Sequence, residues 1–303
     1  MHPAPSVIIF TVTAGAGYGL LFWLALSRLG ALAPSISNTQ LVVAGFIGLL
    51  LVTIGLLSST LHLANPKNAW RSFMRFRTSW LSREAVFAVL FYPITLLWFA
   101  TGGNGWLSAL VALMAIVVLV CTAMIYASLK TIRQWNNALT PVNFVLLGLA
   151  AGAVLFTLIT LIQGTYTPRI LAMAVAAIAA AAFSKLLYFL WIGQPAGPTI
   201  NTALGFTRAT VQLLDVGHSS DTFLTKEFGY QVARAKILWA RVVTVVVGFV
   251  LPLVLLTGLL GNPGVFHAAL AAVLLMAGIF VERWLFFAEA RHVVNLYHGQ
   301  QRT

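Results

Sequence analysis

The chain has 303 residues, of which 60% are hydrophobic and only 8% are charged, and its formal net charge is +12. These values exclude a water-soluble globular protein, which would need several times more charge to cover its surface. We therefore predict an all-α, polytopic integral membrane protein, with residues 1–303 forming a single membrane domain. The positive charge is expected to fix topology and to contact anionic membrane lipid, and we expect no nucleic acid partner.

Eight apolar segments are long enough to cross a bilayer as transmembrane helices. They cover residues 7–28, 40–62, 84–101, 105–129, 142–163, 169–192, 238–260 and 265–290. Small residues that allow helices to approach closely recur in the first two segments, where Gly15, Gly19, Gly45 and Gly48 are suitably spaced. We expect close helix crossings at these glycines.

Lysine and arginine are distributed unevenly about the eight segments. The links after the second and sixth segments carry five each, and the link after the fourth segment and the C-terminus carry two each. Eight spans place these 14 cationic residues on one side, against Arg28 and Arg169 on the other. Because cytoplasmic segments are rich in lysine and arginine, we expect both termini in the cytoplasm and the chain in the inner (cytoplasmic) membrane.

One long polar segment, residues 193–237, separates the sixth and seventh spans. It is too polar to cross the membrane and too short to form an independent domain. We predict a cytoplasmic insert, folded as a hairpin or short helix, that covers the membrane domain or contacts a partner.

The most informative stretch is residues 61–84, LHLANPKNAWRSFMRFRTSWLSRE. His62 ends the second apolar segment and Glu84 begins the third, so both are expected at the same membrane boundary. The link between them is basic and aromatic, a pattern typical of a helix on the membrane surface. That interpretation is compatible with a docking surface for a soluble partner, which we assign to Lys67, Arg71, Arg75 and Arg77.

Further ionisable residues fall inside the predicted spans, where they are costly and therefore candidates for function. Lys185 is close enough to a helix end for its amine to reach the interface, and we expect it to do so. Glu282 and Arg283 are neighbours that project about 100° apart on a helix, so we expect no direct pairing between them. Each needs another partner, either in a structural salt bridge or in a ligand. With Glu289, all of these residues lie in the predicted cytoplasmic half.

A cluster of charges at one face cannot form a path across the membrane, but it suits a lipophilic substrate that exchanges protons near water. Quinone is such a substrate, and a histidine and a carboxylate are the usual groups for its proton transfers. His62 alone is more typical of an interfacial residue that ends a helix, whereas its combination with Glu84 favours a catalytic role. The predicted quinone-binding residues are His62, Arg77, Trp80, Arg83, Glu84, Glu282 and Arg283.

Haem and metal centres are not expected in this chain. The six histidines include no pair at matching depth within the spans, as two axial ligands would require. The single cysteine, Cys121, excludes a cysteine-ligated zinc or iron–sulfur site within the chain. Electrons must therefore arrive from another subunit.

The N-terminal HPAPSVIIFT and GAGYG, together with the stretch LHL…P…AW…SWLSRE, resemble the membrane-anchor subunits of the dimethyl sulfoxide reductase family of molybdenum enzymes. The resemblance covers essentially the whole chain. It implies a haem-free anchor that holds an iron–sulfur electron-transfer subunit and a molybdenum catalytic subunit. Molybdopterin and iron–sulfur clusters would lie on those partners only, with ubiquinone or menaquinone as the substrate of the anchor. The family's quinone-site histidine and glutamate map to His62 and Glu84.

The link LGFTRATVQLLDVGHSSDTFLTKEFGYQVAR is similar to the insert of anchors in the cytoplasmic quinone-dependent sulfite dehydrogenase branch. This similarity implies a subunit of an enzyme that passes electrons from sulfite oxidation to quinone. Three alternatives remain: a dimethyl sulfoxide reductase-type anchor that takes electrons from quinol, a passive anchor, and a secondary transporter. A transporter would need discontinuous helices, for which Pro93 and Pro252 inside the third and seventh segments are the only indication.

Overall fold

A computed structural model describes residues 1–30, 36–61, 63, 65–194, 197–215, 217, 219–220, 222–230, 232–258 and 264–303. Within these residues, eight helices are long and apolar enough to cross a membrane, which confirms the predicted number of spans. Seven are continuous: α1 (Pro5–Arg28), α2 (Asn38–Thr60), α3 (Trp80–Ala100), α4 (Gly105–Ala127), α5 (Leu139–Ile162), α6 (Pro168–Gly193) and α11 (Val265–Ala288). The seventh span consists of α9 (Arg234–Val245), one stretch of π-helix, η2 (Val246–Val250), and α10 (Leu251–Thr257).

The start of α3 lies four residues earlier than predicted. Ser79 forms its N-cap, accepting a hydrogen bond from the backbone N–H of Ser82 at 3.4 Å. Because this polar cap lets Trp80, Leu81 and Arg83 join the first turn, Glu84 lies in the second turn and not at the helix start. Pro93 is accommodated inside α3 without ending it.

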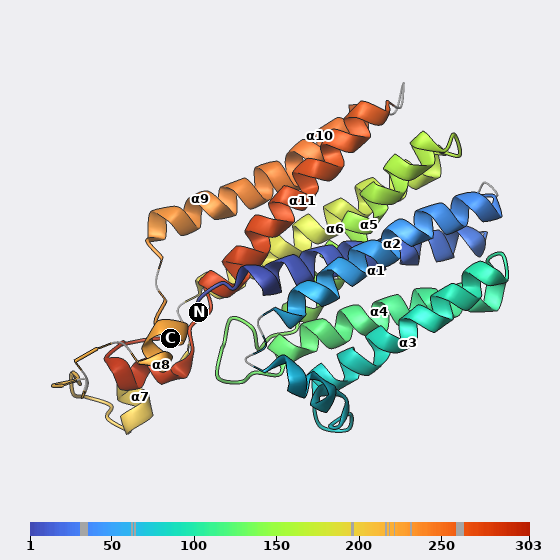
Figure 1. The fold of residues 1–303 in the computed structure, drawn as a ribbon. Helices are drawn as coiled ribbons and strands as arrows, with labels where there is room; N and C mark the ends of the chain where they lie inside the picture. Colours follow the sequence, from blue (N-terminus) through green and yellow to red (C-terminus); the bar gives the residue numbers. More distant parts are fainter. Residues whose placement is uncertain are drawn as a thin grey trace.

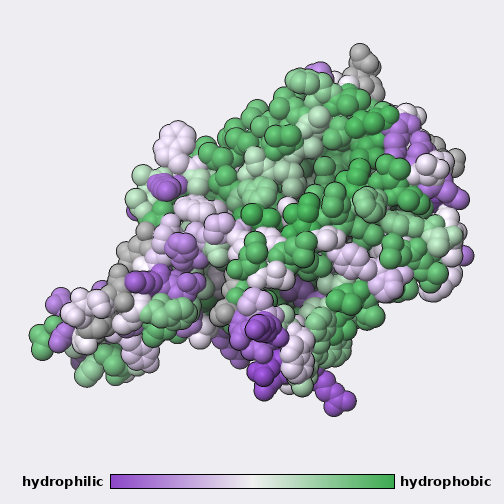
Figure 2. Space-filling model, in the orientation of Figure 1, coloured by the Kyte–Doolittle hydropathy of each residue, from purple (hydrophilic) through white to green (hydrophobic). Residues whose placement is uncertain are grey.

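The helices lie side by side with their ends gathered at two opposite faces of the bundle (Figure 1). Both termini lie at one of these ends, together with the short helices η1 (Pro66–Phe73), α7 (Ile200–Leu204) and α8 (Phe223–Phe228). Hydrophobic residues cover most of the helical surface, while hydrophilic residues concentrate over the ends (Figure 2). The structure therefore places both termini at the same end of the bundle.

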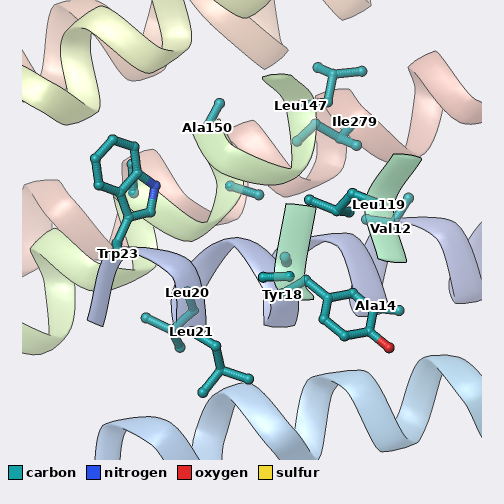
Figure 3. Packing of buried hydrophobic residues seen from close by; sticks show 14 of the residues in the cluster. Val12, Ala14, Tyr18, Leu20, Leu21, Trp23, Leu119, Leu147, Ala150 and Ile279 are labelled. Carbon is teal, nitrogen blue, oxygen red and sulfur yellow. The ribbon is translucent and has the colours of Figure 1, made fainter. Parts of the chain in front are cut away.

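Helix α1 forms the centre of the bundle: 78% of its most apolar stretch is buried, against 22% for the seventh span. Its buried side chains pack against α4, α5 and α11 (Figure 3). The predicted close approach at Gly19 is confirmed, because a Cβ atom there would clash with the carbonyl oxygen of Gly148 in α5. Any side chain at Gly19 would force α1 and α5 apart.

The segment between α6 and α9 is held against the C-terminal tail, which contains the short helix η4 (Val293–His298). The backbone N–H of Ile200 donates to the Gln301 carbonyl at 3.2 Å, and Asn295 Nδ2 donates to the Phe228 carbonyl at 3.0 Å. The segment contains the two short helices α7 and α8, where a hairpin or one short helix was predicted, and it packs on the same end of the bundle as the termini. Its cytoplasmic location stays a prediction.

Candidate functional site

Glu84 is buried between α3 and α4, with only 5% of its surface exposed. Its carboxyl group accepts a hydrogen bond from the Thr122 hydroxyl of α4. The same hydroxyl lies 3.1 Å from the Val118 carbonyl. It can donate to an ionised Glu84, or donate to Val118 while accepting from a protonated Glu84. Both protonation states of Glu84 therefore find a hydrogen-bond partner.

No cation lies within ion-pair distance of the Glu84 carboxylate among the residues that the structure describes. A second polar group close by is Tyr18 of α1, which is buried and packs edge-on against Phe91 at 5.0 Å between ring centroids. The Tyr18 hydroxyl has no hydrogen-bond partner in the described part of the chain, and the charge of Glu84 acts on it. Glu84 is thus a carboxyl group in a largely neutral, apolar environment.

The residues that precede Glu84 hold the link to α2 in place. Arg83 donates from Nε to the Phe76 carbonyl at 3.0 Å and from Nη2 to the Arg77 carbonyl at 2.7 Å. Its guanidinium group also lies over the Trp80 ring, 4.2 Å from the centroid. Arg83 and Trp80 therefore support the link backbone beside Glu84, while the Arg77 side chain is exposed.

The proposed docking residues all lie at the surface of this link. Lys67, Arg71, Arg75 and Arg77 are exposed, and exposed aromatic and sulfur-containing side chains accompany them, with Trp70 at 57% and Met74 at 68%. Such a mixture of basic and large apolar side chains is available to a membrane surface or to a protein partner. The docking role stays a prediction. His62 lies outside the described residues.

The ionisable residues of α6 and α11 form a second group, which we name the buried triad: Lys185, Glu282 and Arg283. The Lys185 amine forms an ion pair with the Glu282 carboxylate, and Arg283 Nε lies 3.2 Å from the other carboxylate oxygen. All three side chains are at most 3% exposed. The triad combines two cations with one anion inside the bundle.

Two sequence-based expectations about these residues were wrong. Lys185 does not extend to the interface, because α6 packs it beside Glu282 and beneath the Tyr188 ring, 4.0 Å from the centroid. Glu282 and Arg283 do pair directly. The Arg283 guanidinium carbon lies over the Phe144 ring of α5, 3.6 Å from its centroid, while Nε lies 3.2 Å from the neighbouring carboxylate.

An aromatic cluster separates the buried triad from Glu84. Tyr126 of α4 stacks with Phe144 at 5.6 Å and meets Phe286 edge-on at 5.4 Å, and Arg283 contacts the same two rings. Tyr126 also lies one turn after Thr122, the hydrogen-bond partner of Glu84, on α4. The predicted site residues therefore form two groups near the same end of the bundle, connected through Tyr126.

Two cavities open near this end, with volumes of about 860 and 510 Å³. Of the predicted quinone-binding residues that the structure describes, none lines either cavity. Among the described residues, no three histidine, cysteine, aspartate or glutamate side chains gather in a way that would hold a metal ion.

Sequence comparisons connect this arrangement to known proteins. A family model described as the DMSO reductase anchor subunit (DmsC) matches residues 1–288. The C subunit of sulfite dehydrogenase from Allochromatium vinosum is 32% identical, over 98% of this chain and 99% of that protein. The C chain of anaerobic dimethyl sulfoxide reductase from Escherichia coli K12 is 32% identical over 52% of this chain and 58% of its own length. A second Escherichia coli K12 protein, the YnfH chain of anaerobic dimethyl sulfoxide reductase, is 29% identical over 49% of this chain and 55% of its own length. Since the family model covers nearly the whole sequence, this protein belongs to the DmsC family of DMSO reductase anchor subunits.

Proposed function

We propose that this chain is the quinone-reactive membrane anchor of a molybdenum and iron–sulfur oxidoreductase. An iron–sulfur subunit binds the exposed surface formed by Lys67, Arg71, Arg75 and Arg77 and delivers electrons to quinone. Glu84 and His62 exchange the two protons that accompany the two-electron reduction. The molybdenum subunit carries the other half-reaction, so this chain does not contact its substrate.

The environment of Glu84 is the observation that carries this proposal. A buried carboxyl group without a cationic partner is costly when it is ionised, so it exchanges its proton readily when a nearby charge changes. The Thr122 hydroxyl supports both protonation states, because it can accept as well as donate. A proton donor and acceptor at a quinone site needs this combination.

Trp80 and Arg83 begin the same helix as Glu84, and we propose that they form the wall of the quinone site nearest the docking surface. Glu282 and Arg283 remain candidates for quinone contact. Glu282 and Arg283 already form ion pairs within the buried triad. These pairs would keep the charges beside the quinone site fixed.

We propose sulfite as the substrate of the molybdenum subunit, with the partners and both termini on the cytoplasmic side of the inner membrane. The match to the sulfite dehydrogenase protein supports this choice, because it covers 98% of this chain, whereas the match to the first of the two dimethyl sulfoxide reductase proteins covers 52%. The cationic residues gathered at one end of the bundle support the orientation. Quinol-dependent reduction of a terminal acceptor is the alternative direction for the same site.

A secondary transporter finds little support. Helix α3 continues through Pro93, and the seventh span is interrupted only by the π-helical residues 246–250. Glu84 and the buried triad lie toward one end of the bundle, whereas a transporter site is expected at the membrane midplane.

The test uses the purified complex with its partner subunits. We expect Glu84→Gln to lower sulfite-driven reduction of a quinone analogue by at least about 100-fold, because the amide cannot exchange a proton. Reduction of a soluble artificial acceptor by the partner subunits should stay unchanged, and so should assembly. Glu227→Gln, at a glutamate of α8 remote from Glu84 in sequence and element, is the matched control. Unchanged quinone reduction in Glu84→Gln would remove Glu84 from the mechanism, and dimethyl sulfoxide assayed in parallel tests the direction.

A further inference from the structure

The larger cavity, which we name the basic cavity, lies where α6 and α11 end and α9 begins, beneath the insert and the C-terminal tail. Its volume is about 860 Å³. Among the described residues, its charged side chains are four arginines, Arg133, Arg241, Arg291 and Arg302, and one acid, Glu289. The cavity therefore carries an excess of positive charge at the boundary of the helical bundle.

The smaller cavity, which we name the apolar groove, runs along α9 and α11. Its volume is about 510 Å³, and Phe280, Val281 and Trp284 of α11 line it opposite Ala240 of α9. Among the described residues that line it, Lys236 alone is charged, and its amine lies 5.6 Å from the centroid of the Trp284 ring. This groove lies along two membrane-spanning segments and is open and not enclosed.

The basic cavity and the apolar groove meet at Tyr230, which lines both. The same two helices also contribute to both. On α9, Lys236 and Ala240 line the groove, while the adjacent Ile237 and Arg241 line the cavity. The charged cavity thus continues into an apolar groove directed along the membrane spans.

Not all of the cavity's cations are engaged within the protein. Arg241 is bound by Glu289, at 2.5 Å between Nη2 and the carboxylate. Arg133 donates to the Gln194 carbonyl at 3.1 Å. The exposed guanidinium groups of Arg291 and Arg302 have no ion-pair partner within the part of the chain that the structure describes. These two side chains are available to an anion.

We propose that the basic cavity and the apolar groove together bind one anionic phospholipid, with the headgroup phosphate among the arginines and the acyl chains along α9 and α11. Guanidinium groups match the geometry of phosphate oxygens, and basic residues at a membrane surface attract anionic lipid. A neutral quinone would make no use of the surplus charge. The inference is independent of the proposed quinone chemistry, because none of the predicted quinone-binding residues that the structure describes lines either cavity.

The first test needs no variant. The complex in detergent is titrated with phosphatidylglycerol or with phosphatidylcholine of the same acyl chains, and bound lipid is counted by native mass spectrometry. We expect phosphatidylglycerol to bind at least tenfold more tightly, and glycerol 3-phosphate, which lacks acyl chains, to bind far more weakly. Equal binding of the two phospholipids would overturn the anionic selectivity. Glycerol 3-phosphate binding as tightly as phosphatidylglycerol would overturn the role of the apolar groove.

The second test locates the site with Arg291→Gln/Arg302→Gln. Removing two basic contacts should weaken phosphatidylglycerol binding by roughly 25-fold, since each is worth about a factor of five. Phosphatidylcholine binding should not change. Arg208→Gln is the matched control, because Arg208 is exposed in the insert and does not line the cavity. A similar loss in Arg208→Gln, or no loss in the double variant, would show that the lipid binds elsewhere.

Discussion

Glu84 and Glu282 are two buried glutamates on neighbouring parts of the same bundle, yet their surroundings differ fundamentally. Glu84 is held by a neutral threonine hydroxyl, whereas Glu282 pairs with Lys185 and Arg283. A buried carboxylate must be neutralised by a cation or by a proton. At Glu282 two cations neutralise the carboxylate, so its charge is fixed. At Glu84 only a proton can neutralise it, so its charge can change.

Glu282 and Glu84 should therefore have different roles. Two cations around Glu282 keep it ionised and tie α6 to α11, so its contribution should be structural. Glu84 joins α3 to α4 through one hydrogen bond, which persists in either protonation state. Variants at Glu282 should therefore affect stability first, and variants at Glu84 should affect quinone reduction first.

Glu282→Gln should give the largest change in stability. Removal of the carboxylate leaves Lys185 and Arg283 as uncompensated buried cations, at a cost of about 3–5 kcal/mol. Thermal unfolding of the complex in detergent measures the loss. Glu84→Gln is the control, with an expected change below about 1 kcal/mol because the amide can keep the hydrogen bond to Thr122. Equal stability of the two variants would invalidate the distinction between the two glutamates.

Lys185→Met should have a smaller effect of the same kind. Glu282 keeps Arg283 as a partner, so about 2 kcal/mol of stability should be lost with the charged hydrogen bond. The double variant Lys185→Met/Glu282→Gln leaves one uncompensated cation in place of two. It should therefore be more stable than Glu282→Gln alone. Strict additivity of the two single changes would mean that Lys185 and Glu282 are not coupled.

The sequence predicts the bundle better than it predicts the contacts within it. The eight spans follow from apolar length, and a close helix crossing follows from Gly15 and Gly19, although these glycines do not reveal that α5 is the partner. The pairing of Lys185 with Glu282 depends on α6 lying beside α11, which no local pattern reveals. A lysine eight residues before a helix end looks equally suited to reach water.

The contacts of Thr122 and Arg83 likewise have no signal in the sequence. Thr122 carries no signal in an apolar segment, because threonine can satisfy its own hydroxyl by donating to a carbonyl of the preceding turn. Arg83 was predicted to bind quinone from its charge and position alone. Its hydrogen bonds to the Phe76 and Arg77 carbonyls depend on the turn that the link forms before α3.

Thr122→Val tests the neutral partner of Glu84. Loss of the hydroxyl leaves the buried carboxyl group without its hydrogen bond, at an expected cost of about 1 kcal/mol. Quinone reduction should fall as well, because neither protonation state of Glu84 is then stabilised. Thr122→Ser keeps the hydroxyl and should restore both stability and turnover. If valine and serine behave alike, Thr122 contributes packing and not a hydrogen bond.

Glu289 provides an intermediate case, with the smallest expected effect. It lies just beyond α11, and burial raises its pKa above the ordinary carboxyl value while Arg241 opposes the shift. In the pH range between the ordinary and the raised pKa, the folded state binds more protons than the unfolded state. The free energy of unfolding should therefore fall as the pH rises through this range. Denaturant unfolding of the complex at a series of pH values measures the slope.

Two variants determine which influence on Glu289 prevails. Glu289→Gln should remove the part of the slope that this carboxyl group contributes, because no proton is then exchanged at this position. Arg241→Gln removes the opposing cation, so burial alone acts on the carboxyl group and the slope should extend to higher pH. If stability instead falls more steeply with pH in Glu289→Gln than in the unmodified protein, the pairing with Arg241 outweighs burial. Glu289 would then share the fixed charge of Glu282, and Glu84 would stand alone as the carboxyl group whose surroundings leave its charge free to change.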